Sequence, residues 1–308
     1  MKNLFLIQHN GFTWINVTKQ SEKELCELEE RFDLFDEDVR QCLPAIQRPK
    51  FVKREFYYFI VLHFPLFNRA TKRIEFAEVD FFLSNTFLIT VHNNTLLPIA
   101  NFFKMCQRLA KNEIPAFQDS AARIILELLH TIIEDTFASI HHVTEDINEI
   151  DRQILAQTPT QGLLQEILRL KTNVVTFRRV IQGQRNVLDR LIMLSGRELA
   201  LSTLQWQLTS LKEYMSEIWS TLETQKESIN ALHETNESGI NLRTNEVMKM
   251  LTVISVVTFP LTLLATVLAI RAPGTPFVEN QLGFWFIFGL VIIGAIGMVI
   301  VFKRRRWL

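Results

Sequence analysis

Two long apolar runs near the end of the chain contain no charged residue. They cover residues 250–270 and 282–302, with a short polar stretch at 271–281 between them. A helix rises about 1.5 Å per residue, so each run is long enough to cross a ~30 Å hydrocarbon core. We therefore expect two transmembrane helices, at 250–270 and 282–302, joined by an extracytoplasmic loop at 271–281.

A heptad pattern precedes the first apolar run and predicts a long helix. The seam positions are Leu204, Leu208, Leu211, Met215, Ile218, Leu222, Gln225, Ile229, Leu232 and Asn236. No proline occurs between Leu201 and Pro260, so a stalk helix at 198–249 is expected to continue into the membrane, about 100 Å in all. Such a seam favours self-association, because polar positions suit a wet central bundle. Packing within one subunit is the alternative.

The segment before the stalk has the pattern of an antiparallel helical hairpin. Apolar residues recur at spacings of three and four over 121–154 and again over 163–194. The sequence Thr-Pro-Thr-Gln-Gly at 158–162 separates the two stretches, and such residues end helices. We assign 118–197 to this hairpin.

Residues 1–117 have a mixed pattern typical of an α/β domain. Aromatic and β-branched residues dominate 56–65 and 79–92, and the second stretch is expected to form two strands joined at Ser84 and Asn85. Short helices are expected at 21–31 and 37–42. The predicted fold class is an α+β cytoplasmic domain followed by a long helical stalk and two C-terminal transmembrane helices.

Composition excludes several classes of function. The chain has 33 basic and 33 acidic residues, and it has no basic patch with interleaved aromatics before the last residues, which argues against a nucleic-acid partner. The three cysteines form no CxxC pair and are expected to be reduced. We find no phosphate-binding loop, dinucleotide motif or catalytic triad signature, and we expect no enzyme activity and no cofactor.

The distribution of positive charge predicts the orientation in the membrane. A basic belt flanks the outer ends of the two apolar runs and consists of Lys249, Lys303, Arg304, Arg305 and Arg306. The positive-inside rule places both chain ends in the cytoplasm of a multi-pass protein of the cell (inner) membrane, in contact with lipids. The N-terminus has no signal-peptide pattern, which agrees with a cytoplasmic first domain.

Two smaller patterns suggest local roles. His142 and Asp146 are four residues apart and could share a metal ion, although a solvated acidic helix face explains them equally well. The metal ligands are therefore left unassigned. Gly294 and Gly297 are expected to let the second transmembrane helix pack closely on the first.

Several stretches carry a resemblance to a known family. The run RTNEVMKMLTVI at 243–254, the sequence FPLT at 259–262 and the end FKRRRWL resemble the CorA magnesium-transporter superfamily, which has two transmembrane helices and a Gly-x-Asn signature. The stretch IQRPKFVKREFYYFIVLHFP at 46–65 is similar to that family's cytoplasmic domain. The resemblance implies a funnel-shaped homopentamer in which the long helix lines a pore for Mg²⁺ or another metal ion such as Zn²⁺.

The selectivity loop departs from the family pattern. Where the family has Tyr-Gly-Met-Asn, this chain has Leu268, Ala269, Ile270 and Arg271. The asparagine would offer carbonyl oxygens to a hydrated Mg²⁺, whereas arginine has no acceptor. Five guanidinium groups about 6 Å from a divalent ion would repel it by on the order of 7 kcal/mol in water. Arg271 therefore faces the pore and alters selectivity, or it turns to the headgroups or pairs with Glu279.

The resemblance also implies a set of pore-lining and gate residues. They are Asn245, Met248, Leu251, Ser255, Phe259 and Thr262. Met248 and Leu251 would form a constriction that gates by dewetting, and simple helix packing is the alternative. The hydroxyls of Ser255 and Thr262 suit a wet wall, although such hydroxyls often bond back to their own helix.

Three functions remain open on the sequence. The first is a CorA-like pentameric channel that passes metal cations down the electrochemical gradient. The second is the same scaffold with altered selectivity, as an anion-permeable, non-selective or tension-gated pore. The third is a non-conducting membrane scaffold or regulator.

Overall fold

The computed structural model describes residues 4–9, 11–19, 21–43, 46–111, 121–156, 161–195, 205–269 and 282–304. The chain divides into two compact units. The first holds the described residues up to His233, and the second holds the described residues from Glu234 onward. The two units are described separately below.

A six-stranded sheet forms the centre of the first unit, with the strand order β1-β2-β6-β5-β4-β3. Only β2 and β6 pair in parallel among the described strands; the other neighbours are antiparallel. The strands are β1 (Leu4–His9), β2 (Phe12–Val17), β3 (Lys50–Lys53), β4 (Tyr58–Asn68), β5 (Arg73–Leu83) and β6 (Phe87–His92). The strands expected at 56–65 and 79–92 are therefore confirmed, with the second stretch divided around Ser84 and Asn85.

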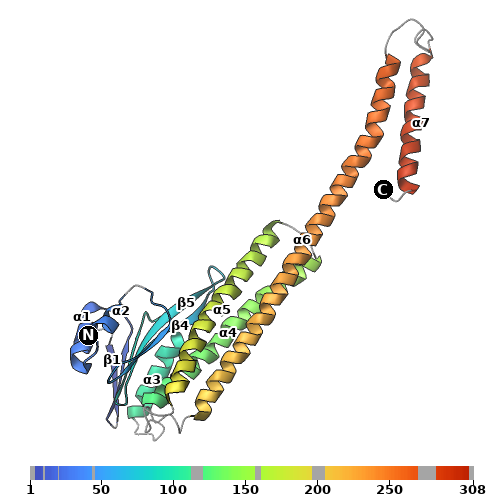
Figure 1. The fold of residues 1–308 in the computed structure, drawn as a ribbon. Helices are drawn as coiled ribbons and strands as arrows, with labels where there is room; N and C mark the ends of the chain where they lie inside the picture. The colour runs from blue at the N-terminus through green and yellow to red at the C-terminus, as the bar shows by residue number, and fades with distance from the viewer. Residues whose placement is uncertain are drawn as a thin grey trace. The chain divides into compact units, whose positions relative to one another are not determined.

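Helices cover both faces of the sheet, which explains the continuous apolar runs in β4 and β6. One face packs against α3 (Leu97–Lys111), α4 (Ala121–Ala156) and α5 (Gln161–Ser195), and the first part of α6 (Gln205–Ala269) joins the same apolar core. The other packs against α1 (Glu22–Phe32) and α2 (Asp36–Gln41) (Figure 1). Alternate residues of β4 go to opposite sides: Ile60 and Leu62 join the first core, and Phe59 and Val61 the second.

The heptad seam of α6 is buried within the subunit. Leu211, Ile218 and Leu222 are at most 1% exposed and belong to the same apolar core as α4 and α5. Gln225 donates from Nε2 to the Thr144 hydroxyl at 2.8 Å and to the Ile140 carbonyl at 3.2 Å, both on α4. The preference for self-association through this seam is therefore wrong, because the hairpin already covers its apolar side and holds one of its polar groups.

A polar clamp ties the turn between β4 and β5 to α5. Asn173 accepts from the Ile74 amide at 3.0 Å and donates to the Lys72 carbonyl at 2.8 Å. Arg169 donates to that same carbonyl and to Asp146 on α4, at 2.6 and 2.9 Å. The structure thus engages Asp146 with an arginine, and it stacks the His142 ring on Phe67 with a centroid distance of 5.0 Å. His142 and Asp146 are thus partly covered, whereas Glu145 and Glu149 on the same helix are more than half exposed, as a solvated acidic face predicts.

The second unit contains the rest of α6 and α7 (Gly283–Arg304). The helix α6 is continuous over 65 residues and includes Pro260, which confirms the single helix expected from the stalk into the first apolar run. Gly294 of α7 approaches Leu261 of α6 closely, as predicted, whereas Gly297 has open space on the side of its missing Cβ among the described atoms. The expectation of close packing at Gly297 is therefore wrong for this helix pair.

Candidate pore-lining site

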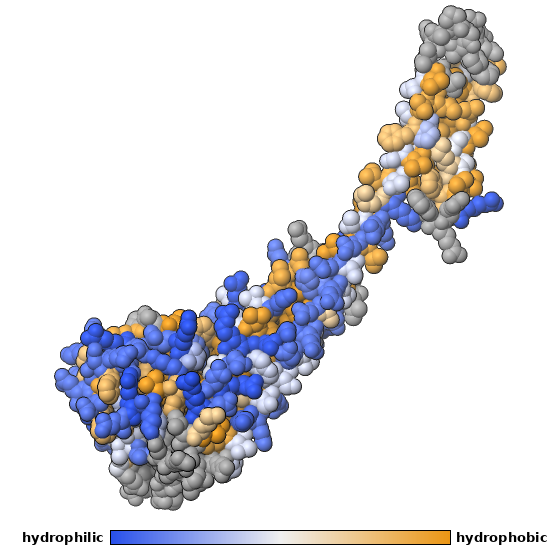
Figure 2. All heavy atoms as spheres, in the orientation of Figure 1, coloured by the Kyte–Doolittle hydropathy of each residue, from blue (hydrophilic) through white to orange (hydrophobic). Residues whose placement is uncertain are grey.

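In the second unit the surface of α7 and of the C-terminal part of α6 is mostly apolar, whereas the preceding part of α6 is hydrophilic (Figure 2). Both helices are long and apolar enough to cross a membrane, and only 6% and 0% of their most hydrophobic windows are buried. The core helix of a soluble protein would bury most of such a window. The exposure of these side chains therefore favours a lipid or subunit environment over a soluble core.

The residues implied as pore-lining lie on the exposed part of α6. Met248 and Leu251 are 57% and 56% exposed, and Phe259 is 74% exposed. Asn245 and Thr262 are also exposed, and Ser255 is half-buried. At about 100° per residue, Met248, Ser255 and Phe259 fall on one face of the helix. Met248 and Phe259 on that face are more than half exposed, so the face is available to a pore or to another subunit.

The hydroxyl groups on this part of α6 donate to their own helix. Ser255 Oγ bonds the Leu251 carbonyl at 2.9 Å, and Thr262 Oγ1 bonds the Thr258 carbonyl at 2.8 Å. This is the alternative that the sequence left open. The hydroxyl oxygens keep lone pairs that can still accept from water, so the bonds are compatible with a wet wall.

A groove lies beside this face, between α6 and α7. It has a volume of about 460 Å³, and its α7 wall includes Val291. Three threonines at spacings of four line it from α6, namely Thr258, Thr262 and Thr266. Thr262 therefore lies between the predicted pore face and the groove. Sequence reasoning did not single out Thr258 and Thr266, although the regular spacing of the three is visible in the printed sequence.

Basic residues lie at the ends of the apolar stretches of this unit. Lys249 precedes the apolar part of α6, and Lys303 and Arg304 form the last turn of α7; all three are exposed. Phe284 and Trp285 at the start of α7 are 68% and 66% exposed, with a centroid distance of 5.6 Å. This placement suits a basic belt at one interface and an aromatic belt at the other.

Several predicted residues lie outside what the structure describes. They are Ile270, Arg271, Arg305 and Arg306, together with the side chains of Leu268 and Ala269. Among the described residues, no group of three or more His, Cys, Asp or Glu side chains could hold a metal ion. A cation beside the described apolar part of α6 would meet hydroxyl oxygens, such as those of Ser255 and Thr262, rather than carboxylates, which suits an ion that keeps its water shell.

Comparisons with known proteins show the family to which the chain is similar. Residues 9–304 match the model of the family described as CorA-like Mg²⁺ transporter protein. The chain is 24% identical over 298 residues to the cobalt/magnesium transport protein CorA of Thermotoga maritima, covering 96% of this chain and 83% of that one. It is also 24% identical to the putative metal ion transporter YfjQ of Bacillus subtilis, covering 96% and 89%.

Solved structures support the same fold. The complete structure of the CorA magnesium transporter from Methanocaldococcus jannaschii superposes with a TM-score of 0.83 at 18% identity, covering 98% of this chain and 93% of that chain. The family model spans nearly the whole sequence, including both apolar helices. This chain therefore belongs to the CorA-like Mg²⁺ transporter family.

Proposed function

We propose that this protein is a homopentameric channel that passes Mg²⁺ or another divalent metal ion down its electrochemical gradient. The second half of α6 lines the pore, α7 supports it from outside, and both chain ends lie in the cytoplasm. Members of the family are ion transporters rather than enzymes, so the activity is a flux with no covalent step. An inside-negative potential contributes about 2.3 kcal/mol per charge per 100 mV to cation entry.

The observation that carries the proposal is the difference between the two parts of α6. Up to Leu232 its apolar side is buried against the hairpin, whereas Met248, Leu251 and Phe259 are more than half exposed. Exposed apolar side chains along one face are stable when another protein surface covers them or when they line a narrow, water-free part of a pore. In a ring of five copies, neighbouring subunits cover part of this face and the rest lines the pore. Met248 and Leu251 then form a gate that opens when water enters it.

Arg271 favours a second candidate, in which the same pore has altered selectivity. By the family resemblance, it takes the place of the asparagine that would bind the hydrated ion. A ring of guanidinium groups at a pore mouth disfavours cations and is how anion pores are built. A non-selective or tension-gated pore belongs to the same candidate.

The deciding measurement is flux through the purified protein in liposomes. Mg²⁺, Zn²⁺ and Cl⁻ uptake are followed with internal indicators while an inside-negative potassium diffusion potential is applied. Uptake of Mg²⁺ or Zn²⁺ that rises with the potential supports the first candidate. Chloride uptake supports the second. A protein that assembles but passes none of the three ions would be a scaffold or regulator, and both pore proposals would fail.

The variant Arg271→Asn tests the electrostatic argument directly. If Arg271 faces the pore, restoring asparagine raises cation flux by at least about tenfold, because part of the repulsion is removed. Arg271→Lys keeps the charge and serves as the control. Unchanged cation flux in Arg271→Asn would mean that the guanidinium lies away from the ion path or is neutralised by a partner.

The gate is tested by comparing neighbouring positions on α6. Leu251→Ser makes the proposed constriction polar and is expected to increase basal flux. Val256→Ser is the matched control, since Val256 is 45% exposed and lies about 140° round the helix from Leu251. Equal effects of the two substitutions would argue against a gate at Leu251.

A further inference from the structure

Two pairs of consecutive residues on the apolar part of α6 combine a small and a bulky side chain. Thr262 precedes Leu263, and one turn later Thr266 precedes Val267. All four side chains are exposed, Leu263 by 65% and Val267 by 55%. The two threonines line the groove between α6 and α7, and we call them the threonine wall. Leu263 and Val267 form what we call the apolar ridge.

The predicted pore face lies between the wall and the ridge. Phe259 is three residues before Thr262 and four before Leu263, so its direction is about 60° from the first and about 40° from the second, on opposite sides. Leu261, which lies against Gly294 of α7, points about 200° round the helix from Phe259. The pore face therefore points away from α7, and the wall and the ridge flank it.

This arrangement is the one that a ring of pore helices requires. Consecutive residues of a helix point about 100° apart. In a closed ring of five, the directions from one member to its two neighbours are about 108° apart and enclose the direction of the axis. When one neighbour lies on the side of the threonine wall, the other therefore lies on the side of the apolar ridge.

The depth of the two surfaces also matches. Consecutive residues differ by only about 1.5 Å along the helix axis, so Thr262 of one copy lies level with Leu263 of the next, and Thr266 with Val267. Subunits related by rotation about an axis along the pore are all at the same depth. A head-to-tail contact of this kind closes into a ring.

The hydroxyl groups of the wall do not oppose an apolar partner. Thr262 Oγ1 donates to the Thr258 carbonyl at 2.8 Å, and Thr266 Oγ1 donates to the Leu263 carbonyl at 2.9 Å. Both hydroxyl hydrogens are thus used within α6, and an apolar ridge that covers them leaves no donor unsatisfied. Small residues such as threonine also let neighbouring membrane helices approach closely.

From these observations we propose that the apolar ridge of each subunit packs on the threonine wall of the next and joins neighbouring pore helices. The proposal rests on the proposed function, since it requires a ring of subunits around a pore. The occupant is a second copy of the chain rather than a lipid chain, because the matching surface lies on the same helix at the same depth.

The test is disulfide cross-linking of the full-length protein in liposomes with copper phenanthroline as the oxidant. The background is Cys26→Ser, because Cys26 is the exposed native cysteine. The double variant Thr262→Cys/Leu263→Cys is expected to give a ladder of covalent species that ends at five chains. Each single variant is the control and should give at least about tenfold less covalent dimer, since a disulfide needs Cβ atoms about 4 Å apart.

Two outcomes of the cross-linking overturn the proposal. Equal cross-linking in a single variant would mean that identical residues meet across the interface. A double variant that gives no covalent species would mean that the wall and the ridge do not meet.

Ion flux in the same liposomes separates this proposal from the proposed function. Metal-ion flux without a cross-link keeps the channel and overturns the contact between wall and ridge. A covalent ladder in a protein that passes no ion supports the contact and removes the channel.

Added bulk at the wall gives an independent test. Thr262→Leu is expected to lower the oligomeric mass in detergent, measured by light scattering, because the added atoms have to displace the neighbouring ridge. Adding Leu263→Ala makes room and should restore the mass. Ile293→Ala is the control, since Ile293 is 72% exposed on α7, and it should not restore the mass.

A lipid chain is the competing occupant of the groove. It predicts that Thr262→Leu keeps the full oligomeric mass, and that result would overturn the proposal. Equal restoration by Leu263→Ala and Ile293→Ala would also contradict a specific contact between wall and ridge.

Discussion

Gly294 of α7 lies directly against Leu261 of α6. A Cβ atom built on Gly294 would be 3.2 Å from Leu261 Cδ2, which is closer than ordinary van der Waals contact. The same construction on Gly297 meets no described atom within 4 Å. One glycine therefore sets how near the two apolar helices approach, and the other, a turn later, does not.

The difference between the two glycines predicts that Gly294→Val destabilises the contact between α6 and α7, whereas Gly297→Val does not. The added methyl groups have to displace Leu261, and overpacking of this kind costs about 1–3 kcal/mol. Thermal unfolding of the purified protein in detergent measures the effect. An equal loss in Gly297→Val would mean that Gly297 faces another packed surface, such as a neighbouring subunit.

Gln225 provides a test of the buried seam. Gln225→Ala leaves a cavity beside α4 and is expected to cost about 2 kcal/mol of stability. Gln225→Leu fills the space and also removes an Oε1 atom that has no partner among the described residues, so it is expected to be neutral or stabilising. The oligomeric mass should be unchanged in both variants. A lower mass would show that the seam contacts a neighbouring subunit.

Gly183 is required by the approach of Pro49 to α5. A Cβ atom on Gly183 would lie 2.9 Å from Pro49 Cγ, and a proline ring cannot swing away. Gly183→Ala is therefore expected to destabilise the first unit by about 1–3 kcal/mol. Gly162→Ala on the same helix is the control, since no described atom lies within 4 Å of its Cβ position. It should be neutral or stabilising by up to about 1 kcal/mol, as read from denaturant midpoints.

Asp80 predicts a pH dependence of stability. Both of its carboxyl oxygens are buried without a hydrogen-bond partner among the described residues. Burial, with a further contribution from Glu78, raises the pKa of Asp80 from 3.8 to about 8, while the Cys42 side chain and Lys50 oppose the shift. The folded state then holds a proton that the unfolded state has released between these two pH values.

Stability contributed by Asp80 is therefore present at low pH and is lost as the pH rises toward 8. The isosteric variant Asp80→Asn does not titrate, so the difference in unfolding free energy between it and the native protein should change steadily from pH 5 to pH 8 and then level off. Chemical unfolding at several pH values measures this difference. A difference that stays constant over the range would show that Asp80 is ionised in the folded protein.

The sequence predicted the long elements well and the short ones less well. The helices at 121–154 and 163–194 and the continuous helix ending near residue 270 were visible because their apolar period persists over many turns. The strands β1 and β2 and the helix α3 were not assigned. Their burial comes from partners far along the chain: Trp14 on β2, for example, packs on Phe103 of α3 with a ring centroid distance of 4.8 Å.

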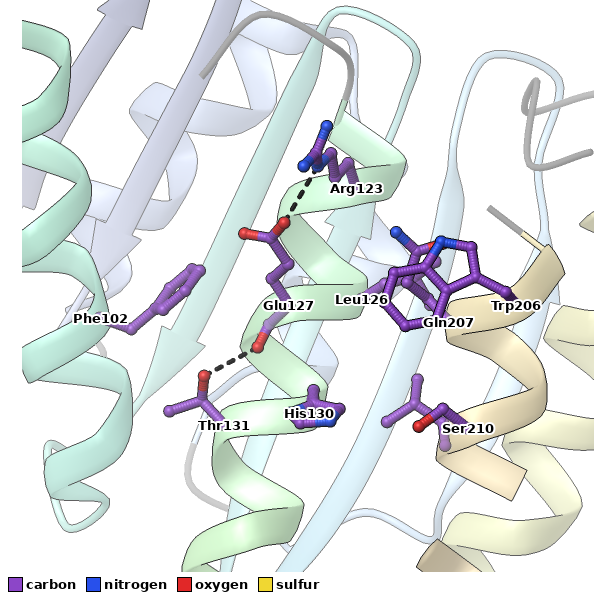
Figure 3. Close-up of a pocket in the computed structure, with 10 residues that line it drawn as sticks. Phe102, Arg123, Leu126, Glu127, His130, Thr131, Trp206, Gln207 and Ser210 are labelled. Carbon is purple, nitrogen blue, oxygen red and sulfur yellow. Dashed lines mark hydrogen bonds and ion pairs between the residues drawn. The ribbon is translucent and has the colours of Figure 1, made fainter. Parts of the chain in front are cut away.

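The candidate pore site was likewise predicted only in part from the sequence. The family resemblance supplied Met248, Leu251 and Phe259, and their exposure on α6 is consistent with that assignment. The groove with Thr258 and Thr266 depends on where α7 lies beside α6, which no local pattern contains. A cavity beside Gln207, shown in Figure 3, likewise requires three helices whose lining residues extend from Phe102 to Leu211 along the chain.

By itself the sequence determined that the chain has two apolar spans, a basic belt at their ends and a long helix leading into the first of them. These follow from length, charge and period, which are local properties of the chain. Only the tertiary structure decided which face of that helix is covered. A heptad seam packs equally well on a neighbouring subunit or on its own hairpin, and the contacts of Gln225 with α4 assign this seam to the hairpin.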